Sequence, residues 1–313
     1  MSQLSQSIWH FYFMYMLLAF AGLGTLPVAY TRAILNWFDE KRGVALGVAL
    51  SGVGLGAIIM PPAIQSLIVN VGWQNAYLVL GFAVLLVSFP IAYFFFVERP
   101  EPNTQMERAA LPIEELGMDV KEALHDRVFW ILVAAFILLG EMSVGTVAHL
   151  LALLTDRGVE VSDAAGLISV LGVTLILGRV VCGYLVDRYF APTVAFGFLF
   201  CSSVGIALLA FGSGPWLTVL AIGLLGLGLG AEFDLMAYLI SRYMGFRAYG
   251  QLFGYLYAAF SVGAGTGPLL MGWIYDKNGS YTDGLFFFSC CALVAALLIR
   301  TLGPYRDFEN FRP

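Results

Sequence analysis

Long apolar stretches alternate with short polar breaks along most of the chain. A helix needs about 20 mainly apolar residues to cross the bilayer core, whereas the strands of a membrane barrel alternate at every second residue. The apolar stretches here are continuous, so the pattern predicts membrane-spanning helices. Nine spans of sufficient length are expected, at residues 9–36, 43–69, 73–97, 128–154, 163–186, 190–212, 215–240, 248–275 and 284–302.

The polar breaks divide the chain unequally. Charged or turn-forming residues interrupt it at Asp39–Arg42, Val71–Gly72 and Gly212–Pro215. The stretch 98–127 is longer and more polar, with prolines and many acidic residues, and we expect a linker with some helix there. The predicted division is therefore a partial N-terminal bundle of three helices, the linker and a C-terminal six-helix bundle, at residues 1–97, 98–127 and 128–313.

Basic residues in the loops predict the orientation. If the linker is cytoplasmic, twelve Lys and Arg residues lie in loops and tail on that side, against two, Arg157 and Lys277, on the other. This excess predicts a cytoplasmic C-terminus and an N-terminus outside for this chain. We expect a multi-pass protein of the cell membrane, such as the inner membrane of a bacterium.

Two stretches repeat at a constant offset of 207 residues: Gly47–Gly72 resembles Gly254–Gly279, with five glycine, alanine or proline positions in common. Glycine and proline mark backbone geometry, so these matches indicate an internal duplication. The duplication places the first three spans on the last three. The chain therefore resembles a transporter of two six-helix repeats without its first three helices.

Composition supports the membrane assignment and excludes other classes. Hydrophobic residues make up 60% and charged residues 12%, against about 45–50% and about 25% in soluble domains. The net charge is −5 and the basic residues are scattered, so we expect no nucleic-acid partner. The four cysteines lie within apolar stretches, and no catalytic or metal-ligand pattern is recognisable. We therefore expect no enzyme activity, no metal site and no cofactor.

Two segments carry a family resemblance. Gly178–Arg188 has the pattern Gly-Arg-x-x-x-Gly-x-x-x-Asp-Arg, which resembles the signature around the eighth helix of the major facilitator superfamily. Trp37–Gly47 is similar to the start of the fifth helix in the monocarboxylate transporter branch, which includes the oxalate/formate antiporters. The resemblance covers nearly the whole chain, as helices four to twelve. It implies an all-α major facilitator fold lacking the first three helices, and transport by alternating access.

The resemblance also implies a substrate class. The antiporters of this branch carry a second cation, a lysine, in helix eleven, and the comparable stretch Ala258–Gly263 has none. A monoanion such as a monocarboxylate is therefore expected rather than a dicarboxylate. The absence of an ATPase motif predicts a secondary active carrier, and we expect proton symport by a monomer in the lipid bilayer.

Six ionisable residues are predicted within spans, where a charge costs about 2.5–3.5 kcal/mol on insertion scales. They are Arg32, Glu141, His149, Arg179, Glu232 and Asp234. Arg179 lies near the middle of its span, and its guanidinium fork matches a carboxylate. The resemblance implies that this arginine binds the carboxylate of the substrate. The alternative is an ion pair with Glu232 or Asp234, and both roles are compatible if the substrate displaces an internal carboxylate.

The acidic residues are candidates for proton coupling. Glu232 and Asp234 are two residues apart and point to different faces of one helix. Each of them is a candidate proton carrier, and each is alternatively a static partner of Arg179. Glu141 is a second candidate. His149, eight residues further on, titrates near neutral pH in solution, and it is a candidate switch or a packed interfacial residue.

Other residues are candidates for lining the path and for gating. Arg32 either extends its charge to the nearby membrane surface or lines the anion path. Gly183, Asp187 and Arg188 match a loop motif whose acid helps to hold one closed state in the resembled family. A carboxylate is stabilised at a helix N-terminus, so we expect Asp187 to meet the start of the 43–69 helix near Gly43. The alternative is a surface ion pair.

One helix is a candidate for bending. The sequence Gly263–Pro268 places a proline after a run of small residues, which predicts a kink in a gating helix. Two further interpretations are open at this stage. They are alternatives to the carrier of a small organic anion: a truncated, non-functional fragment of such a transporter, and an efflux carrier for another substrate class, although the central Arg179 favours anions.

Overall fold

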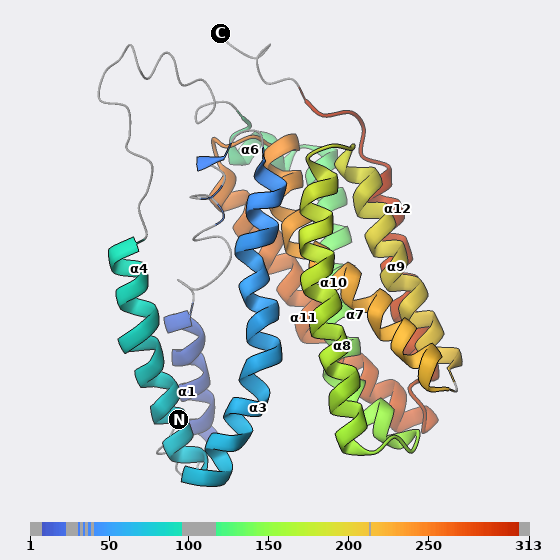
Figure 1. Cartoon of the computed structure of the whole chain (residues 1–313). Coiled ribbons are helices and arrows are strands. Elements are labelled where there is room, and N and C mark those ends of the chain that lie inside the picture. Colours follow the sequence, from blue (N-terminus) through green and yellow to red (C-terminus); the bar gives the residue numbers. More distant parts are fainter. Residues whose placement is uncertain are drawn as a thin grey trace.

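The computed structural model describes residues 8–22, 31, 34, 37–38, 41–95, 117–212 and 214–306. These residues form helices and one isolated antiparallel bridge, between Gly117 and Gly245 (Figure 1). In chain order the helices are α1 (Ile8–Ala21), α3 (Arg42–Ala83), the π-helical turn η2 (Val84–Ser88), α4 (Phe89–Phe95), α6 (Val120–Leu124), α7 (Arg127–Asp156), α8 (Val161–Val186), α9 (Ala191–Phe211), α10 (Pro215–Tyr243), α11 (Tyr249–Asn278) and α12 (Thr282–Arg300).

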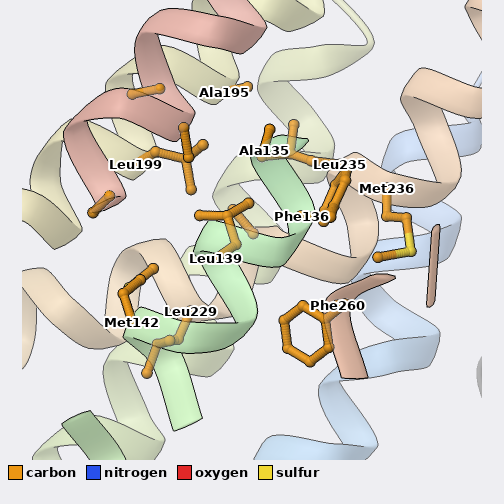
Figure 2. Close-up of a cluster of buried hydrophobic side chains, with 14 of the residues drawn as sticks. Ala135, Phe136, Leu139, Met142, Ala195, Leu199, Leu229, Leu235, Met236 and Phe260 are labelled. Carbon is orange, nitrogen blue, oxygen red and sulfur yellow. The ribbon is translucent and has the colours of Figure 1, made fainter. Parts of the chain in front are cut away.

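Helices α7–α12 pack together around a continuous buried core. The most extensive contacts join α7 to α11, α8 to α10, and α9 to both α10 and α12. Large apolar side chains fill the centre, where Phe136 and Leu139 of α7 lie with Leu199 of α9 and Leu235 of α10 (Figure 2). This core holds α8 and α10 side by side, and these two helices carry the charged residues described below.

Helix α3 connects the N-terminal helices to this bundle. It contacts α8 and α10, and among the described residues no comparable contact joins α1, η2 or α4 to α7–α12. Figure 1 draws α1 and α4 to the left of α3. Leu46 of α3 is fully buried in the main core, whereas the apolar segment Ser66–Phe94 is largely exposed. Such a surface is suited to lipid or to further apolar helices.

The predicted break at Val71–Gly72 is present. Helix α3 is kinked at Gly72, which has φ 79° and ψ 158°, a conformation with positive φ that favours glycine. The chain reverses in this region, so that α4 runs back alongside α3 (Figure 1). Gly72 therefore separates the two spans predicted at residues 43–69 and 73–97.

Each of the last six predicted spans corresponds to one of α7–α12, with ends within three residues of the expected positions. Seven helices in the described part of the chain are long and apolar enough to cross a membrane. Helix α1 has 14 described residues, and α11 has 30 residues but is less apolar because it is rich in glycine and tyrosine. The total of nine spans and the division at residues 97 and 127 stay predictions.

The end of the linker is attached to the bundle. Residues 96–116 lie outside the described residues. Helix α6 follows them, with a capping box formed by Asp119 and Glu122. The backbone N–H of Met118 donates to the carbonyl of Met244 at the end of α10, at 2.8 Å. We use "linker side" for the end of the molecule at which these residues lie, and "far side" for the opposite end.

Candidate functional site

Arg179 of α8 and Asp234 of α10 face one another inside the bundle. Nη1 of Arg179 lies 3.7 Å from Oδ1 of Asp234, and the side chains are 3% and 2% exposed. Nε and Nη1 of Arg179 and both carboxylate oxygens of Asp234 are buried without a hydrogen-bond partner. The two residues form an ion pair in which several strong donors and acceptors are unused, and unused guanidinium donors are able to bind another carboxylate.

Glu232 belongs to the same group of charges. It is 2% exposed, and its carboxylate interacts electrostatically with Arg179. Ser143 of α7 lies beside this carboxylate, and its hydroxyl donates to the carbonyl of Gly140 on its own helix at 3.5 Å. Oε1 of Glu232 has no hydrogen-bond partner. We call Arg179, Glu232 and Asp234 the α8–α10 cluster. One cation thus faces two carboxylates, and burial of an incompletely paired charge is costly, so the number of protons bound here matters for stability.

Small residues bring α8 and α10 close enough to form this cluster. A Cβ atom at Gly178 would overlap the carbonyl oxygen of Leu227, and a Cβ atom at Gly230 would overlap that of Leu175. Backbones approach this closely only where side chains are absent. The glycines therefore place Arg179 directly opposite the acidic turn of α10.

Glu141 lies at a different interface, between α7 and α11. Its Oε1 accepts a hydrogen bond of 3.1 Å from the hydroxyl of Thr266. Its backbone stands against Gly263 and Gly267 of α11, and its carboxylate interacts electrostatically with Cys291 of α12. Glu141 is half-buried and hydrogen-bonded, and it is not part of the α8–α10 cluster.

His149 binds the same helix further along. Its Nε2 lies 3.1 Å from the carbonyl oxygen of Pro268, and its ring centroid is 5.6 Å from that of Tyr281. Nε2–H is therefore the donor. This geometry matches the packed alternative considered for His149. Pro268 stands inside α11, and the bend expected there stays a prediction.

Asp187 makes the contact expected from the sequence. Its carboxylate accepts two backbone hydrogen bonds at the start of α3, from Gly43 at 2.8 Å and from Val44 at 3.0 Å. The helices cross so closely that a Cβ atom at Gly43 would overlap the carbonyl of Gly183, and the reverse also holds. Arg188 lies over the ring of Tyr184 at 4.0 Å. Asp187 thus joins α3 to α8 on the linker side, and its gating role stays a proposal.

The sequence interpretation missed two polar side chains, Ser143 beside Glu232 and Thr266 beside Glu141. Both are single hydroxyls within apolar stretches, and such residues commonly bond to their own helix. Only the packing of α7 against α10 and α11 distinguishes them. Arg32 lies outside the described residues, so its predicted role has no structural counterpart here.

Curated relatives cover most of the chain. Monocarboxylate transporter 12-B of Danio rerio is 29% identical over 315 residues, which span 89% of this chain and 64% of the relative. Monocarboxylate transporter 11 of Mus musculus is 27% identical over 304 residues, which span 94% of this chain and 66% of the relative. The chain therefore covers a little under two thirds of the length of these relatives.

Solved structures share the fold at lower identity. The fucose:proton symporter FucP of E. coli matches with a TM-score of 0.65 and 18% identity, over 90% of this chain and 74% of that protein. A bacterial homologue of the iron transporter ferroportin, in an outward-facing state, matches with a TM-score of 0.61 and 16% identity, over 94% of this chain and 74% of that protein.

These proteins are transporters rather than enzymes, and the all-helical fold found here is theirs. The sequence profile of the Major Facilitator Superfamily matches residues 1–256. The chain is therefore a multi-pass membrane protein of the Major Facilitator Superfamily.

Proposed function

We propose that the chain acts as a secondary carrier of a small organic monoanion, and that the anion's carboxylate binds Arg179. The observation that carries this proposal is the under-bonded guanidinium, which is buried opposite Asp234 with Nε and Nη1 unused. The monocarboxylate transporters among the relatives support the substrate class.

The α8–α10 cluster provides a mechanism for proton coupling. When a substrate carboxylate pairs with Arg179, Asp234 loses its cationic partner. A buried carboxylate without a cation is more stable when it is protonated. Binding of the anion therefore brings a proton to Asp234 or Glu232, and release of the anion restores the internal ion pair and frees the proton. The two species then cross together, as in symport.

The closed linker side supports alternating access. Asp187 holds α8 to the start of α3, and α3 covers the backbone of Arg179 at Gly47. We propose that the linker side is cytoplasmic, in agreement with the excess of basic residues there. The structure then represents a state that is closed to the cytoplasm. Arg179 is 3% exposed, so a substrate reaches it after a rearrangement of α3 relative to α8.

The test is uptake of labelled monocarboxylates, dicarboxylates and amines into proteoliposomes that contain the purified chain. We expect uptake of a monocarboxylate, driven by a pH gradient and abolished by a protonophore. Arg179→Ala is expected to remove the uptake. Transport of amines in preference to carboxylates, or normal carboxylate uptake by Arg179→Ala, would contradict the proposed function.

A further inference from the structure

The chain continues beyond α12 across the linker side of the bundle. Residues 302–306 form no helix, yet Leu302 is only 4% exposed and belongs to the main core. The hydroxyl of Tyr243, at the end of α10, donates to the carbonyl of Gly303 at 2.6 Å. We call residues 302–306 the C-terminal strap, because contacts with several helices hold this irregular segment against the bundle.

Tyr305 of the C-terminal strap caps helix α9 from a distant part of the chain. The residue before α9, Phe190, has no side-chain acceptor, so the first N–H groups of the helix need another partner. The N–H of Ala191 donates to the hydroxyl oxygen of Tyr305 at 2.7 Å. The ring of Tyr305 also lies 5.0 Å from that of Phe190 and 5.4 Å from that of Tyr243. The strap therefore joins the start of α9 to the end of α10.

Arg306 attaches the same strap to the end of the linker. Its guanidinium forms an ion pair with Oδ2 of Asp126, and its Nη1 lies 3.1 Å from Sδ of Met118. Asp126 is also the N-cap of α7, where its Oδ1 accepts a hydrogen bond of 2.7 Å from the N–H of Val128. One carboxylate thus caps α7 with one oxygen and binds the strap with the other.

The two attachments differ in their sensitivity to salt. Tyr305 packs against the main core, and Arg242 of α10 lies over its ring at 5.3 Å. Arg306 and Asp126 are 32% and 11% exposed, so water and dissolved ions reach their ion pair. Salt screens such a pair, whereas it leaves apolar packing largely intact. The attachment to α9 and α10 is therefore expected to persist under conditions that separate Arg306 from Asp126.

We propose that the C-terminal strap is a releasable device that fixes the end of the linker to the bundle. Tyr305 anchors the strap on α9 and α10, and Arg306 holds or releases the linker through Asp126. While the ion pair is formed, α6 and the start of α7 move together with α9 and α10. When it separates, the end of the linker moves independently of these helices. This inference goes beyond the proposed carrier function and requires no substrate.

Hydrogen exchange followed by mass spectrometry tests the proposal on the whole purified chain in detergent. Arg306→Gln is expected to raise the exchange rate of the amides in α6 about 2- to 5-fold, as for the loss of a partly exposed ion pair. The first turn of α9 is expected to keep its rate. Arg306→Lys keeps the charge and is expected to restore most of the protection of α6. Arg300→Gln, at an exposed position at the end of α12, is the matched control and is expected to change neither segment.

Tyr305→Phe tests the other attachment. The ring is retained, but the N–H of Ala191 loses its acceptor, so exchange in the first turn of α9 is expected to rise about 3- to 10-fold, as for a lost helix cap. The rate in α6 is expected to stay the same. Tyr189→Phe, at an exposed position shortly before α9, is the matched control and is expected to leave both rates unchanged.

Salt distinguishes a releasable contact from a fixed one. Raising the ionic strength is expected to speed exchange in α6 of the unchanged chain, and to have little further effect in Arg306→Gln. Equal exchange in α6 for Arg306→Gln and Arg300→Gln, or an undiminished salt effect in Arg306→Gln, would overturn the inference. An unchanged α9 in Tyr305→Phe would overturn the proposed anchor. Since exchange needs no substrate, these failures are separate from a failure of the proposed function.

Discussion

The two polar regions of the bundle differ in how well their groups are paired. In the α8–α10 cluster, Arg179 and Asp234 are buried at 3.7 Å with several donors and acceptors unused. Between α7 and α11, Glu141 and His149 are only partly buried, and each has a hydrogen-bond partner, at 3.1 Å in both cases. Unused buried groups are costly in a static structure, so they are expected where a ligand or a proton completes them. We therefore propose that α8–α10 carries the transport chemistry and that the polar groups between α7 and α11 attach these two helices to each other.

The largest effect is expected at Arg179. Arg179→Lys keeps the positive charge but loses the planar fork that binds a carboxylate through two bonds. We expect the affinity for a monocarboxylate to fall about 100-fold or more, since breaking a buried charged contact typically costs about 2–5 kcal/mol. Binding is measured by isothermal calorimetry on the purified chain. Arg300→Lys, at an exposed position at the end of α12, is the matched control and is expected to bind normally. If Arg179→Lys and the unchanged chain bind the monocarboxylate with equal affinity, the α8–α10 cluster does not differ from the α7–α11 interface in the way proposed here.

Asp234→Asn is expected to have the next largest effect, and a different one. The amide keeps the shape of the side chain but cannot take up a proton. Uptake driven by a pH gradient is expected to fall about 10-fold or more, while exchange of labelled for unlabelled anion at equal pH continues, because exchange needs no net proton movement. Glu232→Gln is the paired variant, and the carboxylate whose loss separates exchange from uptake is the proton carrier. If both variants keep uptake driven by a pH gradient as well as exchange, proton coupling does not pass through this cluster.

Glu141→Gln is expected to have a small effect. The amide oxygen still accepts the hydrogen bond from Thr266, so the contact between α7 and α11 is kept. We expect gradient-driven uptake within about threefold of the unchanged chain, as for a neutral hydrogen bond that is preserved. A loss as large as that of Asp234→Asn would make Glu141 a coupling residue and would remove the distinction between the two regions.

His149→Phe tests attachment, with the smallest effect on transport. The ring volume is retained, but the carbonyl of Pro268 loses its donor. We expect a loss of stability of about 1 kcal/mol, seen as a lower unfolding temperature in detergent, with little change in the pH dependence of uptake. A shift of the pH profile without a change in stability would instead favour the switch considered for His149 from the sequence.

The sequence predicted those parts of the structure that follow from local physical constraints. The length of the apolar stretches predicted the positions of α7–α12. Gly72 predicted a break because glycine is a turn-forming residue, and its φ is positive in the structure. For Arg179 the sequence leaves two roles open, binding of the substrate carboxylate and an ion pair with Glu232 or Asp234. For Asp187 it predicts a contact with the start of α3, because a helix N-terminus stabilises a carboxylate. Both contacts are present.

The remaining contacts depend on packing between distant segments. Thr266 meets Glu141 across 125 residues of sequence. A single hydroxyl in an apolar helix carries no periodic or charge signal, so its partner is set by the crossing of two helices. Whether Asp234 or Glu232 pairs with Arg179 was also open, since the rotation of α10 decides it. Helix geometry alone does not specify that rotation.

In the proposed mechanism a substrate carboxylate replaces Asp234 at Arg179, and a proton enters with it. The most direct measurement is the uptake of protons from a weakly buffered solution when a monocarboxylate binds to the purified chain in detergent. We expect uptake of about one proton per bound anion. This proton uptake is expected to be abolished in Asp234→Asn or in Glu232→Gln. Binding of the anion without proton uptake, or proton uptake that persists in both variants, would contradict it.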